Sequence, residues 1–185
     1  MKTWLYFFLL LSPLILLSCE ETDSANSEQK GIPIQLFKDR IQQQDSLLDL
    51  QEIFKEIPAE FIEEVELKDR ALKHKMTFQA VSLEKIFSLW HEESKLDVAN
   101  TSLVFTCKDG YSPSMPLSNM YGKGGFITLG VKNSNGSFSW PDSVAKEFAP
   151  LYLVWRDLEE GIRGYPWPYG LTKMKLTNTR NTFAA

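Results

Sequence analysis

The pattern of apolar and polar positions divides the chain into three parts. Residues 4–17 are almost wholly apolar, interrupted only by Ser12 and Pro13. Residues 20–30 (EETDSANSEQK) are polar, and one alanine is their only aliphatic side chain. From Ile32 onward apolar residues return at regular spacings, so we expect the folded part of the protein to begin there.

Two segments of this third part have the spacing of amphipathic helices. The first runs from an N-cap at Ser46 to a stop at Pro58, and the second begins after an N-cap at Ser82. The apolar residues expected to share a face are Leu47, Leu50, Ile53, Phe54 and Ile57 in the first helix and Leu83, Ile86, Phe87 and Trp90 in the second.

Alternating or continuous apolar runs predict a larger number of short strands. The predicted strands are 63–67, 76–80, 103–107, 126–129, 151–155 and 173–176, with a further short segment ending at Leu117. The run 151–155 (LYLVW) is the most apolar of these and is predicted to be a central strand. Many short strands with two or three short helices predict an α+β domain that is mainly β.

Length and charge limit the possible functions. We expect a leader at residues 1–18, a flexible tether at 19–31 and a single domain at 32–180. The formal net charge is −4, and loss of Lys2 with the leader makes it one unit more negative. Nucleic acid is therefore not an expected partner, because phosphate binding needs clustered Lys and Arg.

The end of the apolar run carries a recognisable processing signal. Residues 4–17 are shorter than the roughly 20 residues that span a bilayer and suit a secretory leader. Leu16-Leu17-Ser18-Cys19 resembles the lipobox of bacterial lipoproteins, which are cleaved before the cysteine. The resemblance implies that Cys19 carries a diacylglycerol with acyl chains such as palmitate, and that the domain is anchored to a membrane in the cell envelope, facing the periplasm or the exterior. An uncleaved anchor and an ordinary secreted protein are the alternatives.

Catalytic motifs are scarce in the chain. His74 lies in a lysine-rich turn and His91 follows a helix, so both are expected to be exposed polar residues rather than metal ligands. No CxxC or HExxH spacing is present. Cys107 is expected to be buried in a strand. Because soft metals prefer thiolate ligands, Cys107 also remains a weaker candidate for a metal ligand. No catalytic residue is predicted.

Aromatic residues provide a stronger signal. They are roughly twice as frequent between Phe138 and Tyr169 as the 12% found in the whole chain. A cluster of Trp and Tyr can form the core or a stacking surface for a ligand or partner. The residues predicted for such a contact surface are Trp155, Tyr165, Trp167 and Tyr169, with Tyr111 nearby.

The order of these segments resembles a known family. Residues 65–69, 78–87, 105–117 and 151–176 follow one another as in the oxidoreductase molybdopterin-binding domain, the fold of the sulfite oxidase family. The Asp109-Gly110-Tyr111 turn followed by Pro116-Leu117 carries most of this resemblance. It implies a reduced form of that fold over about residues 60–177, and a redox protein as a partner.

The same resemblance implies a cofactor that this sequence is poorly equipped to bind. Catalytic members hold molybdenum through a cysteine on a segment ahead of the DGY turn, and that segment is missing here. Cys107 lies within the strand before the turn, two residues ahead of Asp109, and does not match the ligand position. No cofactor is therefore expected, with molybdopterin as the alternative.

Three functions remain open from the sequence. The first is a membrane-tethered, non-catalytic binding or accessory module of the cell envelope. The second is a molybdopterin-dependent oxidoreductase that uses Cys107. The third is a structural lipoprotein without a small ligand.

Overall fold

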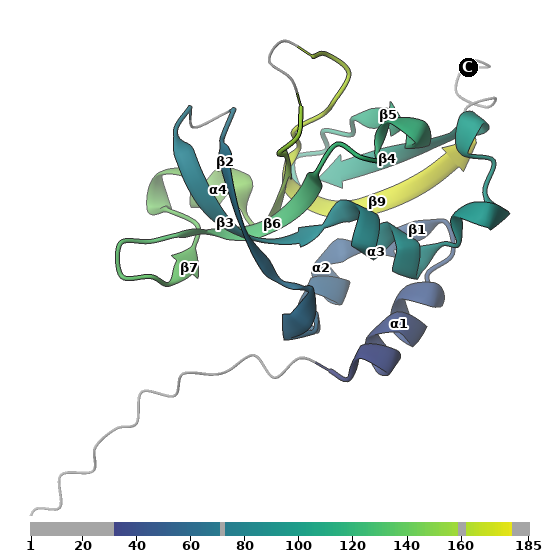
Figure 1. The fold of residues 1–185 in the computed structure, drawn as a ribbon, viewed down its shortest axis with the longest axis horizontal. Coiled ribbons are helices and arrows are strands. Elements are labelled where there is room, and N and C mark those ends of the chain that lie inside the picture. The colour runs from purple at the N-terminus through teal and green to yellow at the C-terminus, as the bar shows by residue number, and fades with distance from the viewer. Residues whose placement is uncertain (1–31, 71–72, 159–161, 179–185) are drawn as a thin grey trace, which may run out of the picture.

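The structure is a computed structural model in which residues 32–70, 73–158 and 162–178 are described (Figure 1). More of the described residues lie in strands (37%) than in helices (28%), so the fold is α+β and mainly β, as predicted. The helices are α1 (Ile34–Gln42), α2 (Leu50–Phe54), α3 (Leu83–Trp90) and α4 (Asp142–Phe148). The strands are β1 (Leu47–Asp49), β2 (Glu63–Lys68), β3 (Lys75–Ser82), β4 (Thr101–Cys107), β5 (Ser114–Pro116), β6 (Gly125–Lys132), β7 (Phe138–Ser139), β8 (Leu151–Trp155) and β9 (Tyr169–Asn178). Short 3-10 turns lie at Ala59–Phe61, Glu93–Lys95, Val98–Asn100 and Leu117–Asn119.

The strands form one antiparallel sheet that curls into a half-barrel. Its main path is β2-β3-β6-β8-β9-β4-β5, while β1 pairs with β9 and β7 pairs with β6. All five residues of β8 are buried, because this strand lies in the middle of the path with side chains covered on both faces. The prediction of a central strand at 151–155 is therefore confirmed.

Two hydrophobic clusters lie on the two faces of this sheet. The larger one joins the apolar faces of α1, α2 and α3 to β4, β9 and the residues Leu151, Leu153 and Trp155 of β8. The smaller one is closed by β2 and α4, and it takes Tyr152 and Val154 from the alternate positions of β8. The curl of the sheet brings Val65 and Leu67 of β2 into this second cluster.

Most predicted elements are present. The strands at 63–67, 76–80, 103–107, 126–129 and 173–176 are all found, and β9 extends well beyond its predicted bounds at both ends. The helix predicted after Ser82 is also confirmed. Ser82 caps it, since its hydroxyl accepts a hydrogen bond from the amide of Lys85 (3.4 Å).

One predicted helix starts too early. Leu47–Asp49 is the strand β1, which pairs with β9, and α2 begins only at Leu50. The cap is Asp49, whose carboxylate accepts from the amide of Glu52 (3.3 Å), and not Ser46. Residues 47–49 form backbone hydrogen bonds with β9, and this pairing is more favourable than extending the helix over the same residues. The prediction that the helix begins after an N-cap at Ser46 is therefore wrong. Helices α1 and α4 were not predicted.

The leader, the tether and Cys19 lie outside the described residues. Across 32–70, 73–158 and 162–178, no helix has the length and apolar character needed to cross a membrane.

Candidate functional site

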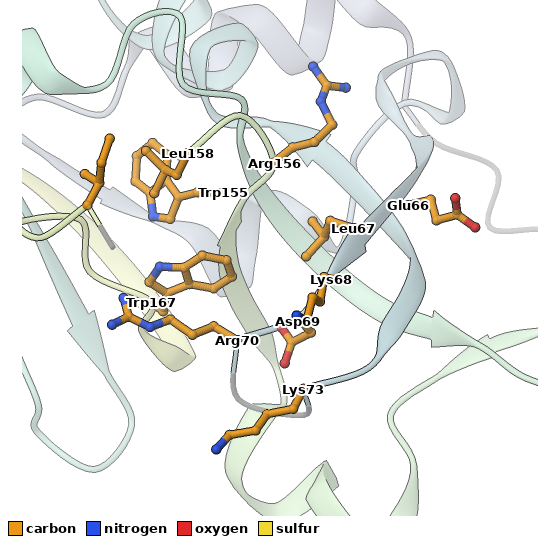
Figure 2. A pocket seen from close by; sticks show the side chains of 11 residues that line it. Glu66, Leu67, Lys68, Asp69, Arg70, Lys73, Trp155, Arg156, Leu158 and Trp167 are labelled. Atoms are coloured by element: carbon orange, nitrogen blue, oxygen red, sulfur yellow. The ribbon is translucent and has the colours of Figure 1, made fainter. Parts of the chain in front are cut away.

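A pocket with a volume of about 580 Å³, within the range of small-molecule sites, is lined by residues from two parts of the chain. Its lining comes from the end of β2 and the residues after it, and from the end of β8 and residues before β9. Its lining residues are Glu66, Leu67, Lys68, Asp69, Arg70, Lys73, Trp155, Arg156, Leu158, Ile162 and Trp167 (Figure 2).

Two tryptophans form one wall of the pocket. Trp155 ends β8 and is only 2% exposed. Its indole N–H donates to the carbonyl of Pro166 (2.7 Å), and Tyr165 packs against its ring edge to face at 5.1 Å. These contacts tie the proline-rich segment to the end of β8, so Trp155 is held rigidly. Trp167 lies below it in Figure 2, half-buried beside the same pocket.

The opposite wall is the turn after β2. The carbonyl of Asp69 accepts from the amide of Lys73 (2.8 Å), and the amide of Asp69 donates to the carbonyl of His74 (2.8 Å). Lys73 has a φ of 59°, a left-handed conformation that is uncommon for a residue other than glycine. A residue keeps such a conformation only where the surrounding structure holds it in place.

The lining residue Asp69 forms a buried polar pair with Tyr152, which lies behind the lining. Asp69 is 1% exposed, and Tyr152 on β8 is fully buried. Burial and the negative charge of Asp69 both raise the pKa of the Tyr152 hydroxyl, so this phenol stays protonated at physiological pH. The indole N–H of Trp167, whose ring centroid lies 6.4 Å from that of Tyr152, is buried and has no hydrogen-bond partner within the described residues.

Two of the charged residues that line the pocket, Glu66 and Arg156, form ion pairs. Glu66 forms an ion pair with Lys75 (2.5 Å), and Arg156 donates two hydrogen bonds to Asp157 (2.9 and 3.0 Å). The bonds from Arg156 hold the pKa of Asp157 below its usual value, so this pair is fully charged and adds no net charge.

The remaining cations of the pocket are Lys68, Arg70 and Lys73. All three are exposed, and within the described segments none has a carboxylate within 4 Å. Figure 2 shows Arg70 extending toward Trp167 and Lys73 reaching outward from the turn, while Glu66 points away from the indoles. The pocket therefore presents an excess of positive charge beside an apolar wall.

The structure brings together three of the five predicted contact residues. Trp155 and Trp167 line the pocket, and the ring of Tyr165 packs edge to face against that of Trp155. Tyr169 also contacts Tyr152, but it stacks on Phe148 at 5.5 Å and is 42% exposed at a separate small hollow.

Tyr111 lies in the turn between β4 and β5 and is 58% exposed. Its amide donates to the Asp109 carboxylate (2.9 Å), and its carbonyl accepts from the amide of Cys107 (2.9 Å). These bonds order the DGY turn without bringing the tyrosine ring into the pocket.

Cys107 does not offer a ligand to this site. It is 3% exposed on β4, opposite Leu171 of β9, and is absent from the pocket lining. Burial, with a further contribution from the charge of Asp109, raises its pKa to about 11, so the thiol stays protonated. No cluster of three or more His, Cys, Asp or Glu placed to hold a metal occurs in the described portion of the chain.

Sequence reasoning missed the wall contributed by the turn after β2. The run Lys68-Asp69-Arg70 looks like an ordinary solvated turn, and it lies far along the chain from Trp155. The φ of Lys73 and the burial of Asp69 are its distinguishing features, and neither can be read from residue types. Only the alternation of Val65 and Leu67 hinted that β2 packs inward.

Comparison of the sequence with models of known protein families finds no match, and comparison with curated proteins finds none either.

Proposed function

We propose that this protein is a lipid-anchored, non-catalytic binding module of the bacterial cell envelope, and that the pocket lined by the end of β2, by Arg70 and Lys73, and by Trp155 and Trp167 binds a small molecule. The pocket itself is the observation that carries the proposal. It combines a rigid indole, a second indole with a buried N–H that lacks a partner in the described residues, and charged groups at the rim. Apolar walls with a few placed polar groups are typical of small-molecule sites.

The membrane anchor is part of the same proposal. It rests on the lipobox-like Leu16-Leu17-Ser18-Cys19 and on the polar residues 20–30 that follow. A lipid on Cys19 would keep the binding domain at the membrane surface, and a polar tether would leave the pocket free to meet its ligand. A redox protein in the envelope is the proposed partner.

We further propose that the fold is a reduced form of the molybdopterin-binding domain. The support is the order of β2, α3, the DGY turn between β4 and β5, β8 and β9, which follows the order of the segments that carry the resemblance. This proposal extends to the fold and not to the cofactor. Catalytic members of that family hold molybdenum through a cysteine thiolate, whereas Cys107 is buried with a protonated thiol, so Cys107 does not fit the role of that ligand.

The proposed pocket can be tested by fluorine NMR of the full chain labelled with 5-fluorotryptophan, purified in a non-ionic detergent. The chain has five tryptophans, and single Trp→Phe variants assign their resonances. We expect 2-naphthamide or 2-naphthoate to shift the resonances of Trp155 and Trp167, because these two indoles line the pocket. Trp90 and Trp140 lie outside the pocket and serve as internal controls.

Replacing Trp167 by Ala removes half of the aromatic wall, so the response of Trp155 should disappear. If neither compound shifts Trp155 and Trp167 at millimolar concentration, or if all four resonances shift alike, the pocket is not a binding site and the proposal is wrong.

A further inference from the structure

The polar groups of the pocket specify more than a site for an aromatic ring. We infer that its ligand is a planar organic acid, whose ring packs against Trp167 next to the buried Trp155 and whose anionic group is bound by Lys68, Arg70 and Lys73. This inference rests on the proposed binding function and adds the charge and shape of the ligand.

The charge follows from how the cations are paired. Glu66 is engaged by Lys75, and Arg156 by Asp157, so these residues leave the pocket close to neutral. The other charged lining residues are Lys68, Arg70, Lys73 and Asp69, which give an excess of two positive charges within the described lining. Electrostatic complementarity therefore favours an anion over a neutral or cationic ligand.

The shape follows from the apolar lining. Leu67, Leu158 and Ile162 add apolar surface to that of the two indoles in the lining of the pocket. The half-buried indole of Trp167 can stack on a flat ring, because offset stacking adds to the burial of apolar surface, whereas Trp155 is 2% exposed and offers little surface of its own. A bare inorganic anion would leave this apolar surface exposed, so inorganic phosphate alone does not suit the site.

The buried carboxylate of Asp69 sets the orientation of the ligand. It is 1% exposed and lies beside Tyr152, whereas Lys68, Arg70 and Lys73 are exposed. An anion close to Asp69 would be repelled, so the acidic group is placed at the three exposed cations and the ring on the apolar side of the pocket.

The test compares 2-naphthoate with 2-naphthamide, which has almost the same shape without the charge. The labelled full chain in non-ionic detergent is titrated with each compound, and the shift of the Trp155 and Trp167 resonances gives the affinity. We expect the acid to bind about tenfold more tightly, since each exposed cation contributes only modestly. This preference should shrink as salt is raised, because exposed charges are screened.

Matched variants separate the rim charges from the overall charge. The double variant Lys68→Gln/Lys73→Gln should lose most of the preference for the acid while its affinity for the amide stays within about twofold. The control Lys95→Gln/Lys175→Gln removes the same charge from exposed positions outside the pocket and should keep the preference. Arg70→Gln should behave like the first variant, and inorganic phosphate should compete weakly.

The outcomes distinguish this inference from the function on which it rests. Equal affinity for the acid and the amide, or the same loss in both double variants, would overturn the planar-acid inference and leave the pocket as a binding site. No response of Trp155 and Trp167 to either compound would overturn both.

Discussion

At the scale of single residues, the thiol of Cys107 illustrates how position decides chemistry. It alternates with Leu103 and Phe105 on β4, and all three side chains are buried. Burial disfavours the thiolate, and the carboxylate of Asp109 adds to this effect, so the pKa rises from 9.0 to about 11. The residue is therefore a small apolar side chain of the core and not a nucleophile.

This leads to a prediction about reactivity. At pH 8 the native thiol should be alkylated by iodoacetamide at least about 100-fold more slowly than in urea, because two pKa units lower the thiolate fraction by that factor. The native rate should rise about tenfold for each pH unit up to about pH 11, the pKa of Cys107. Mass spectrometry of the modified peptide measures the rate, with Cys107→Ser as the blank. Native and unfolded rates within a few-fold of each other would contradict the assignment.

Replacing Trp155 and replacing Tyr169, two residues of the predicted contact surface, should lower the free energy of unfolding by different amounts. Trp155→Ala should lower the free energy of unfolding by about 3–5 kcal/mol, since a buried ring leaves a cavity. Tyr169→Ala should cost about 1 kcal/mol, because the ring is largely exposed and mainly loses its stacking on Phe148. Urea denaturation followed by far-UV circular dichroism measures both. A larger loss for Tyr169→Ala than for Trp155→Ala would show that their environments are misassigned.

At the scale of elements, the segment around Asp49 shows competition between helix and strand. Leu47 fits the helical spacing, yet β9 has a free edge that takes Leu47–Asp49 as a third pairing strand. The helix then begins at the next residue, where Asp49 can cap it.

The cap provides a prediction. Asp49→Ala should lower the free energy of unfolding by about 1 kcal/mol, the usual contribution of an N-cap side chain. Asp49→Asn keeps a capping oxygen and should retain most of the stability, while Ser46→Ala should change it little. Urea denaturation of the three variants checks this. A greater loss for Ser46→Ala than for Asp49→Ala would restore the longer helix.

The alternation of apolar and polar residues predicted most strands, because helices and other strands pack on the faces of the sheet.

The sequence pattern did not predict α1 and α4. The residues of α1 that point inward are Phe37 and Ile41, and α4 buries only Phe148. The single buried residue of α4 gives little periodic signal, whereas Ile34, Phe37 and Ile41 of α1 do have helical spacing that the prediction overlooked. Both helices are stabilised by the clusters they cover.

At the scale of the whole molecule, the proposed lipid anchor can be tested separately from the folded domain. Cys19→Ala should prevent lipid attachment and move the protein from the membrane fraction to the soluble fraction, because a lipid chain supplies the membrane affinity. Fractionation of cells with immunoblotting and metabolic labelling with palmitate measure both. A Cys19→Ala protein that stays in the membrane fraction would mean that the lipid is not the anchor; Cys107→Ala, which leaves the proposed lipid site intact, is the matched control.

The cofactor question is also decided on the whole protein. We expect the purified full chain to contain no stoichiometric molybdenum and no pterin fluorescence, because its only domain cysteine is buried and protonated. Elemental analysis by plasma mass spectrometry measures the metal. Equimolar molybdenum would favour the oxidoreductase alternative over a binding module.

The candidate site was predictable only in its aromatic half. Trp155 and Trp167 are marked in the sequence by their density and by the intervening prolines. The cations Lys68, Arg70 and Lys73 come from a turn remote in sequence, which reaches the indoles only because the sheet curls. Curl depends on the sum of twist and packing over many strands, and no local pattern encodes it.

The sequence by itself determined that this is an α+β domain rich in strands, with β8 at its centre and with Cys107 buried, because burial and alternation are properties of neighbouring residues. The tertiary structure alone decided that β9 captures Leu47–Asp49, that Tyr169 and Tyr111 lie apart from the pocket, and that a charged turn faces two tryptophans. These outcomes depend on contacts between distant segments, whose geometry arises only when the whole sheet closes.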